Sequence, residues 1–158
     1  MARRTTPLQR EIKQKRPFRS RGQEATIALL RTADVVRRRL TRTVEPHGIT
    51  LQQYNVLRIL KGASPDPLPT LEIAQRMIEE QPGITRLLDR LGAKGLVRRE
   101  RCADDRRQVH CWITKAGLDL LAELDPVVNK ADEAAVAALS PAQLQQLLQL
   151  LEVIRTDE

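Results

Sequence analysis

The feature that most constrains the fold lies in the middle of the chain, between residues 70 and 114. A short helical pattern leads into a turn and then into a second helix, which begins near Pro82 and stops at Gly95. Residues 96–102 and 109–114 alternate as two antiparallel strands do, and a charged six-residue loop joins them. This order predicts a helix-turn-helix followed by a β-hairpin, which is the plan of a winged helix.

Helical patterns also precede and follow this unit. Ser20, Thr50 and Ser140 each stand three residues before a glutamine, the spacing of a capping box at the start of a helix. We also expect Thr70 and Thr114 to cap helices, and Pro126 to kink the helix that contains it unless a helix boundary falls there. In the helix from residue 70, the side chains expected to face inward are Leu71, Ala74, Met77 and Ile78.

The expected fold class is mainly α with a small β-hairpin wing. The domain prediction is a basic arm (1–19), a dimerisation helix (20–46), a winged helix-turn-helix domain (49–114) and C-terminal dimerisation helices (115–158). The first and last helices carry apolar stripes that so small a winged domain cannot cover, so a helical dimer interface is predicted to cover them.

Charge is distributed unevenly along the chain. The net charge is +7, but residues 1–43 hold 13 Lys or Arg against 3 Asp or Glu, whereas residues 119–158 hold 2 against 8. One side of the protein is therefore expected to meet a polyanion. Residues 1–19 fit either a solvated, partly disordered tail or an arm that reaches into a DNA groove. No signal peptide, membrane span or disulfide framework is visible, which favours a cytoplasmic location.

A recognition helix lies in the major groove of DNA, where base edges can be distinguished. Arg86 is the strongest candidate to read a base, because a guanidinium can pair with two acceptors of guanine at once. Gln81 and Thr85 are the next candidates. Arg90, one turn further, is expected to touch phosphate or an internal carboxylate.

The predicted wing adds a second set of candidates. Asp104 or Asp105 can pair with an arginine across the loop and stiffen it, which leaves Arg107 for the minor groove and Arg106 as partner or second contact. The alternative is a solvated hairpin with weak surface ion pairs. On the first strand, the arginines expected to contact phosphate are Arg98, Arg99 and Arg101.

Other chemistry finds little support in the sequence. Adjacent His110 and Cys111 point to opposite faces of a strand, and neither Cys102 nor His47 completes a zinc spacing, so no metal site is predicted. No nucleophile-base arrangement or phosphate-binding loop is present, so we expect neither an enzyme nor a cofactor.

The stretch ITRLLDRLGAKGLVRRERCADDRRQVHCWITKAGLDLL (84–121) resembles the multiple-antibiotic-resistance regulator (MarR) family of bacterial transcription factors. The resemblance extends over roughly residues 25–155, and GITLQQYNVLRIL (48–60) is similar to the second helix of the family. It implies a homodimer joined through the first and last two helices, a pseudo-palindromic operator, and release by a small phenolic or anionic ligand. The sequence departs from the family in Gln81-Pro82-Gly83, in its longer basic extension, and in having both cysteines on the wing strands.

The predicted function is therefore a DNA-binding transcriptional regulator. Its expected partners are double-stranded DNA, a second copy of the chain and a small effector whose binding residues the sequence does not identify. One alternative is a nucleoid-associated protein with little sequence preference, which the basic N-terminus favours. Another is a protein-interaction module whose winged domain does not bind DNA. A membrane-surface role is weaker, because no helix combines a basic face with Trp or Phe anchors.

Overall fold

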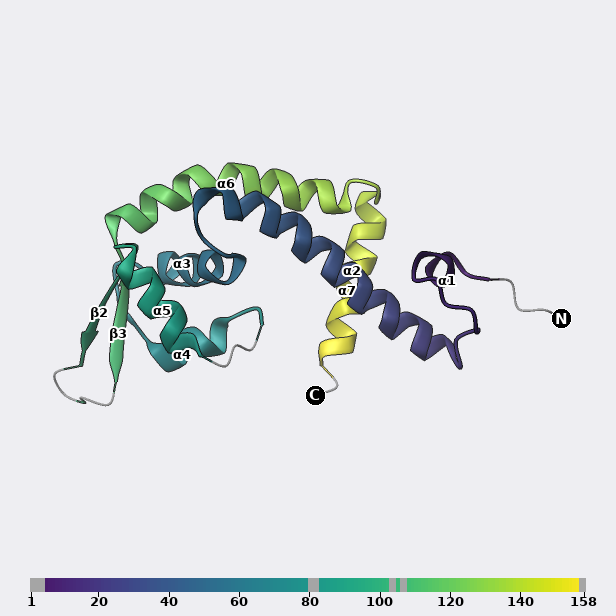
Figure 1. The fold of residues 1–158 in the computed structure, drawn as a ribbon, viewed down its shortest axis with the longest axis horizontal. Helices are drawn as coiled ribbons and strands as arrows, with labels where there is room; N and C mark the ends of the chain where they lie inside the picture. The colour runs from purple at the N-terminus through teal and green to yellow at the C-terminus, as the bar shows by residue number, and fades with distance from the viewer. Residues whose placement is uncertain (1–4, 80–82, 103–104, 106–107, 157–158) are drawn as a thin grey trace. The chain divides into compact units, whose positions relative to one another are not determined.

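The computed structural model describes residues 5–79, 83–102, 105 and 108–156 (Figure 1). The chain divides into two compact units, Met1–Arg39 and Leu40–Glu158. The first unit contains α1 (Pro7–Glu11) and most of α2 (Arg21–Val44). The second contains η1 (Glu45–His47), α3 (Leu51–Ala63), β1 (Leu68–Pro69), α4 (Thr70–Arg76), α5 (Ile84–Ala93), β2 (Val97–Arg101), β3 (Val109–Ile113), α6 (Lys115–Val136) and α7 (Pro141–Arg155). The predicted class, mainly helical with a small wing, is confirmed.

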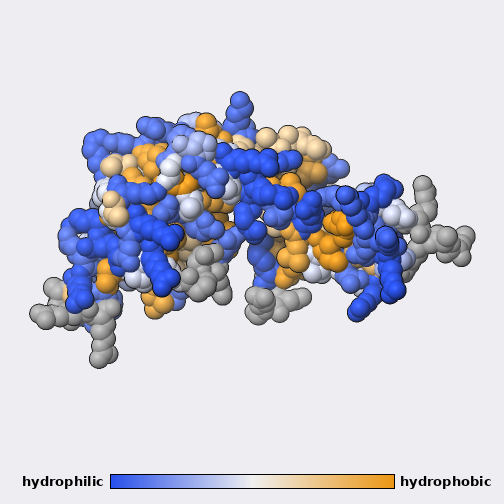
Figure 2. Space-filling model, viewed as in Figure 1, coloured by the Kyte–Doolittle hydropathy of each residue, from blue (hydrophilic) through white to orange (hydrophobic). Residues whose placement is uncertain are grey.

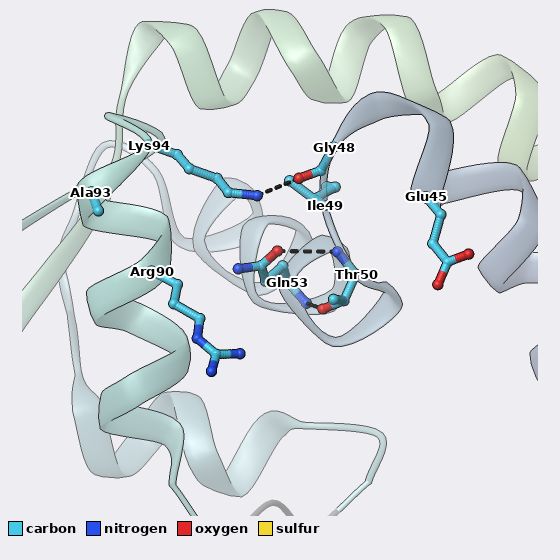
Figure 3. Close-up of a pocket in the computed structure, with 8 residues that line it drawn as sticks. All are labelled: Glu45, Gly48, Ile49, Thr50, Gln53, Arg90, Ala93 and Lys94. Carbon is cyan, nitrogen blue, oxygen red and sulfur yellow. Dashed lines mark hydrogen bonds between the residues drawn. The ribbon is translucent and has the colours of Figure 1, made fainter.

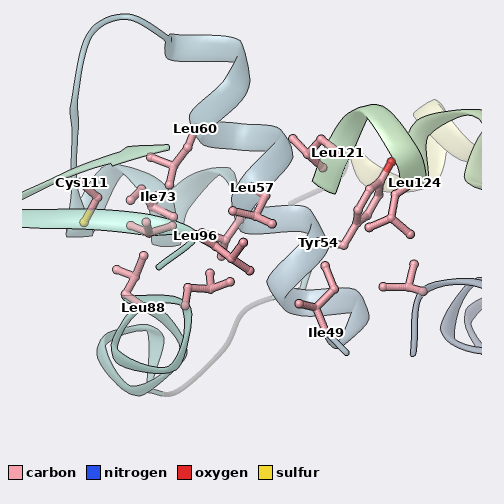
Figure 4. Close-up of a cluster of buried hydrophobic side chains, with 14 of the residues drawn as sticks. Ile49, Tyr54, Leu57, Leu60, Ile73, Leu88, Leu96, Cys111, Leu121 and Leu124 are labelled. Carbon is pink, nitrogen blue, oxygen red and sulfur yellow. The ribbon is translucent and has the colours of Figure 1, made fainter. Parts of the chain in front are cut away.

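The core of the second unit forms around α3 (Figure 4). Leu57 and Leu60 of α3 are fully buried, and they share one apolar cluster with Leu88 of α5, Cys111 of β3 and Leu121 of α6. Each of these elements contributes one apolar side, as amphipathic helices and one-sided strands do. The helix-turn-helix and the wing are therefore built on a single core.

The wing sheet has three strands in the order β1-β3-β2, whereas the sequence predicted two. The added strand, β1, pairs with β3 through Leu68 opposite Cys111 and Pro69 opposite His110. It was missed because a Pro-rich segment is typical of a loop, and only its last two residues pair. Proline is tolerated there because β1 lies at an edge of the sheet.

The prediction for α4 was partly wrong. Leu71 and Ile78 are 71% and 86% exposed, and the buried residue is Ile73. Met77 packs against the core, and Ala74 is half-buried. The predicted face was displaced because α4 ends at Arg76, so that Ile78 lies beyond the helix.

The predicted cap at Thr70 was also wrong. Pro69 takes the N-cap position without a side-chain hydrogen bond, and the Thr70 hydroxyl instead donates to the Val109 carbonyl at 3.2 Å. Thr70 therefore ties α4 to the wing sheet.

The other predicted caps can be compared directly with the structure. Reciprocal capping boxes are present at Thr50 and Ser140, and the Thr114 hydroxyl accepts from the Gly117 amide. At the start of α2, the Ser20 hydroxyl accepts from the Gln23 amide at 3.0 Å, but the Gln23 side chain accepts from Arg19 N–H at 2.7 Å. The expected capping box at Ser20 is therefore only half formed, because the Gln23 side chain bonds to the backbone of Arg19 instead of that of Ser20.

The start of α6 lies very close to the wing. A Cβ atom built on Gly117 would lie 2.5 Å from the Leu96 carbonyl oxygen and 2.8 Å from Ile113 Cγ1. The Thr114 hydroxyl donates to the Gly95 carbonyl at 2.7 Å, which fixes the same corner. Downstream, α6 continues through Pro126, so no helix boundary falls there.

The last helix, α7, forms as predicted but buries none of its side chains. Leu148, Leu150, Val153 and Ile154 are all exposed. Figure 2 shows apolar atoms open to solvent along this helix. The predicted dimerisation role of α7 remains a prediction.

Candidate nucleic-acid interface

The second helix of the helix-turn-helix, α5, presents the side chains that the sequence singled out. Gly83 precedes it with a φ of 102°, a conformation that glycine adopts at little cost. Leu88 and Leu91 are fully buried, whereas Thr85 and Arg86 are exposed. These side chains give α5 a core face and an open polar face. Contact of the open face with DNA remains a prediction.

Arg86 and Arg90 differ in their surroundings. Among the residues that the structure describes, no carboxylate pairs with Arg86, so its guanidinium can receive a ligand. Arg90 is exposed and lines a pocket beside α3, and no carboxylate in the described part of the chain pairs with it. The third candidate, Gln81, lies outside the described residues.

Most of the predicted wing tip also lies outside the described residues, namely Asp104, Arg106 and Arg107. Asp105 is described: its Oδ2 accepts from the Gln108 side-chain amide at 3.2 Å, and its carbonyl accepts from the Gln108 N–H at 2.9 Å. The Gln108 carbonyl accepts in turn from Cys102 N–H at 3.0 Å. Asp105 thus contributes to closing the hairpin.

The three strand arginines do not form one phosphate-facing row. Successive residues of a strand point to opposite faces. In the register of β2 and β3, Arg98 lies opposite Trp112 and Arg99 lies opposite Cys111. Arg98 lies 4.2 Å from the Trp112 ring centroid and also pairs with Glu100. Arg98 is therefore held on the outer face, by a cation–π contact and an exposed ion pair.

The sequence predicted Arg99 as an exposed residue that contacts phosphate, but its surroundings differ from that prediction. It is half-buried, and its guanidinium pairs with Asp89 of α5. Its Nε atom is buried without a hydrogen-bond partner among the described residues. Arg99 therefore connects the recognition helix to the wing, a role that sequence reasoning missed. Arg101, at the end of β2, is exposed.

Cys111 lies beside Arg99 and is fully buried. Burial raises the pKa of the Cys111 thiol, and this effect outweighs the opposite effect of its contacts with Thr70 and Arg99. The thiol is therefore kept in its protonated, less nucleophilic form. Within the described part of the chain, no group of three His, Cys, Asp or Glu side chains could hold a metal ion, and no helix there is long and apolar enough to cross a membrane.

A pocket of about 570 Å³ lies between the start of α3 and the end of α5 (Figure 3). The pocket is open to solvent over much of its surface. Lys94 donates to the Gly48 carbonyl at its rim, and the Thr50–Gln53 capping box forms one wall. Sequence reasoning missed this pocket because its walls lie about 40 residues apart. The lining residues are Glu45, Gly48, Ile49, Thr50, Gln53, Arg90, Ala93 and Lys94.

A polar cluster joins α3 to α6. Asp125 accepts hydrogen bonds from the Tyr54 hydroxyl (3.1 Å), Arg58 (2.9 Å) and Lys61 (2.8 Å). Burial tends to raise the pKa of Asp125, but the hydrogen bonds from Lys61, Arg58 and Tyr54 together prevail, and the pKa is lowered. Tyr54, Arg58 and Lys61 lie on one face of α3, so spacing alone could have grouped them but not identified their partner.

Comparisons with known proteins agree on one family. Residues 47–108 match a family model described as the MarR family. The crystal structure of a MarR transcription factor from Planctomyces limnophilus is 38% identical, with a TM-score of 0.68, over 87% of this chain and 99% of that one.

Two further structures share the fold. A DNA complex of MepR from S. aureus is 21% identical, with a TM-score of 0.77, over 84% of this chain and 97% of that one. BpsR from Bordetella bronchiseptica, whose DNA binding is regulated by 6-hydroxynicotinic acid, is 20% identical, with a TM-score of 0.76, over 84% and 98%.

Proposed function

Because the chain belongs to the MarR family of transcription regulators, we propose that it is a ligand-responsive repressor that binds a pseudo-palindromic operator as a homodimer. The observation that carries this proposal is the open polar face of α5, where Arg86 is exposed without a carboxylate partner among the described residues. The opposite face of α5 is held in the core by Leu88 and Leu91. A helix held in this way offers its polar side chains to the major groove at little further cost in entropy.

Arg86 is proposed to read a guanine, with Thr85 and Gln81 contacting neighbouring bases or phosphates. A bidentate arginine–guanine pair contributes about 1–3 kcal/mol of discrimination against other bases. Arg90 is assigned to the pocket beside α3 rather than to a base.

The wing is proposed to meet the adjacent minor groove through Arg107, with Arg106 as a second contact. Asp104 and Asp105 would hold the loop, as the hydrogen bonds of Asp105 with Gln108 suggest. Arg98 and Arg101 remain candidates for phosphate contacts. Arg99 is reassigned as a positioning residue, because its ion pair with Asp89 connects the wing to α5.

The exposed apolar side chains of α7 support the homodimer. A second copy that covered Leu148, Leu150, Val153 and Ile154 would remove an apolar surface from water. A symmetric dimer would also place two recognition helices about one DNA turn, roughly 34–36 Å, apart.

The pocket between α3 and α5 is the proposed effector site. It borders the C-terminal half of α5, and its charged lining residues are two cations, Arg90 and Lys94, and one carboxylate, Glu45. The excess of positive charge suits a small carboxylate. A ligand there releases DNA only if it favours a protein conformation that does not fit the operator. The regulation of BpsR by 6-hydroxynicotinic acid gives a precedent within the fold.

The proposal is tested by measuring affinity for DNA taken from upstream of the protein's own gene and for a scrambled duplex. Wild-type protein is expected to prefer the operator by about 10³-fold or more. Arg86→Ala should lose about 10- to 100-fold of that preference, from the 1–3 kcal/mol of a bidentate pair. Lys130→Ala, an exposed charge on α6, is the matched control and should change neither affinity. Equal affinity of the wild type for both duplexes would rule out a sequence-specific regulator.

The charge of the N-terminal unit favours a second candidate, a nucleoid-associated protein that binds DNA with little sequence preference. The same measurement decides between the two functions, because such a protein would bind both duplexes equally and would be unaffected by Arg86→Ala.

Small aromatic carboxylates test the effector site by their ability to release the operator. Lys94→Met should weaken release at least tenfold and leave DNA affinity unchanged. Release that is equally efficient with this variant would place the effector elsewhere.

A further inference from the structure

We propose that residues 5–19, folded against the beginning of α2, form a second DNA-binding surface that contacts phosphates without reading bases. This segment is called the basic N-terminal loop below. The choice of DNA as its polyanion rests on the proposed function, whereas the existence of an ordered cationic surface does not.

The loop is ordered by a short helix and a buried glutamine. At the start of α1, Thr6 and Gln9 form a reciprocal capping box. Gln9 is only 5% exposed, and its side-chain amide donates to the Arg16 carbonyl at 3.1 Å, while its own carbonyl accepts from Gln14 N–H at 2.9 Å. Gln14 donates to the same Arg16 carbonyl at 2.8 Å. A buried polar side chain with its hydrogen bonds satisfied is a feature of folded structure and not of a solvated tail.

Two hydrogen bonds join the loop to α2 within the same compact unit. Arg31 of α2 donates to Glu11 at 2.8 Å, and Arg19 N–H donates to the Gln23 side chain at 2.7 Å. Phe18 is buried, with 5% of its surface exposed. The pKa of Arg31 is raised, chiefly by its hydrogen bond to Glu11. The backbone from α1 to α2 is therefore held in one arrangement.

The cations of this loop are left to solvent. Lys13, Lys15, Arg16 and Arg19 are all exposed, and no carboxylate among the described residues pairs with any of them. Four like charges within seven residues repel one another, so an ordered backbone that gathers them has a cost in free energy.

The acidic residues of this unit do not relieve the repulsion, because arginines of α2 already pair with them. Glu11 pairs with Arg31, Glu24 with Arg21, and Asp34 with both Arg31 and Arg38. The loop therefore has a charge excess that only an external anion can neutralise.

A DNA backbone fits this excess better than a membrane does. Phosphates follow one another along each strand at about 3.4 Å of helix axis, so one short loop can meet several of them. Stable attachment to a bilayer surface generally needs apolar side chains to enter it as well. The single aromatic residue of the loop, Phe18, is buried and unable to do so.

The experiment compares two double variants of the full chain with the same change in charge. Lys13→Gln/Lys15→Gln removes charge from the loop. Lys115→Gln/Lys130→Gln removes as much from exposed positions of α6. Fluorescence anisotropy gives affinities for operator and scrambled duplexes over a range of salt concentrations.

The loop variant is expected to bind both duplexes at least tenfold more weakly. The slope of log affinity against log salt should fall by about 0.9 for each phosphate that a protomer of the variant no longer neutralises. The ratio of the two affinities should stay unchanged, because phosphate contacts carry no sequence information. The control variant should stay close to the wild type.

A second variant tests order rather than charge. Gln9→Ala keeps every cation but removes one of the two hydrogen bonds to the Arg16 carbonyl, and with it the Gln9 side chain that accepts from Thr6 N–H. Severalfold weaker binding would support a preorganised surface, and unchanged binding would overturn it.

Equal salt slopes for the loop and control variants would overturn the proposal. If the loop variant also lost binding to phosphatidylserine vesicles while its DNA slope matched the control, the surface would be a membrane contact instead. Failure of the proposed function is visible separately, as wild-type protein that does not distinguish operator from scrambled DNA. The difference in slope between the variants can be measured on scrambled DNA alone.

Discussion

The first half of α6 and the last helix, α7, belong to the same compact unit and are both amphipathic, yet only one of them buries its apolar side. In α6, Leu121 and Leu124 are fully buried, and Gly117 packs against the carbonyl of Leu96. No side chain of α7 is buried, and Leu150 and Ile154 are more than half exposed.

The difference shows which apolar side chains of the chain are buried by the chain itself and which are not. The elements from α3 to the start of α6 share one buried core, whereas α7 carries apolar side chains that none of the described residues buries. Fully burying a leucine or isoleucine side chain is worth about 1.5–3 kcal/mol, so several such side chains provide ample free energy for association. Changes in α7 should therefore disturb assembly, and changes at the start of α6 should disturb folding.

The largest expected effect comes from placing charge on α7. Leu150→Lys/Ile154→Lys should shift the protein from dimer to monomer at micromolar concentration and weaken operator binding at least 100-fold, because two half-sites would no longer be bound together. Sedimentation velocity and anisotropy measure the two effects, and circular dichroism should show the helices retained.

The matched control adds the same charges at the same spacing on the polar side of α7. Gln145→Lys/Gln149→Lys should leave the dimer and its DNA affinity close to those of the wild type. A Leu150→Lys/Ile154→Lys protein that remains dimeric would show that α7 does not supply the interface.

A smaller effect is expected from filling the space at Gly117. Gly117→Ala brings a Cβ atom to 2.5 Å from the Leu96 carbonyl, and either α6 or the wing must move. Overpacking of this kind costs about 1–3 kcal/mol, which a shift in the urea midpoint would report. Gly62→Ala is the control, since no atom lies within 4 Å of its Cβ position, and it should be neutral or stabilising by up to about 1 kcal/mol. Equal midpoints for the two variants would show that the close approach can relax without cost.

The elements that the sequence predicted well are those whose signals are local. Capping boxes at Thr50 and Ser140 and the alternation of β3 require only neighbouring residues, and all three are present. The inner face of α4 was predicted less well, because a helix of seven residues has too few apolar positions to fix its phase. Ile73 is buried in the core that α4 shares with α3 and β3, and no local pattern reports such packing.

The candidate site shows the same limit. The open face of α5 followed from periodicity, since Leu88 and Leu91 fix the direction of Arg86. The ion pair of Arg99 could not be predicted in this way, because its partner Asp89 lies on another element, ten residues earlier. Asp125 likewise meets Arg58 over a separation of 67 residues, and sequence spacing cannot identify such a pair.

The smallest expected effect concerns Asp125, which joins α6 to α3 just before Pro126. Its carboxylate accepts three hydrogen bonds, is 20% exposed, and has a pKa below the ordinary value of 3.8. Asp125→Asn should therefore lower the free energy of unfolding at neutral pH by about 1–2 kcal/mol, as expected for partly exposed hydrogen bonds to a charged group.

The sign of the pH dependence follows from the lowered pKa. A carboxylate whose pKa is depressed in the folded state contributes its full stabilisation above the unfolded-state value of about 3.8 and loses it as the pH falls through the folded-state pKa. The difference between wild type and Asp125→Asn should therefore be constant around neutral pH and shrink in acid, as urea midpoints would show. Asp119→Asn, which removes an exposed pair with Lys115, should change stability by only a few tenths of a kcal/mol. An Asp125→Asn effect as small as that of Asp119→Asn would show that the packing of Leu121 and Leu124, and not this cluster, holds α6 against α3.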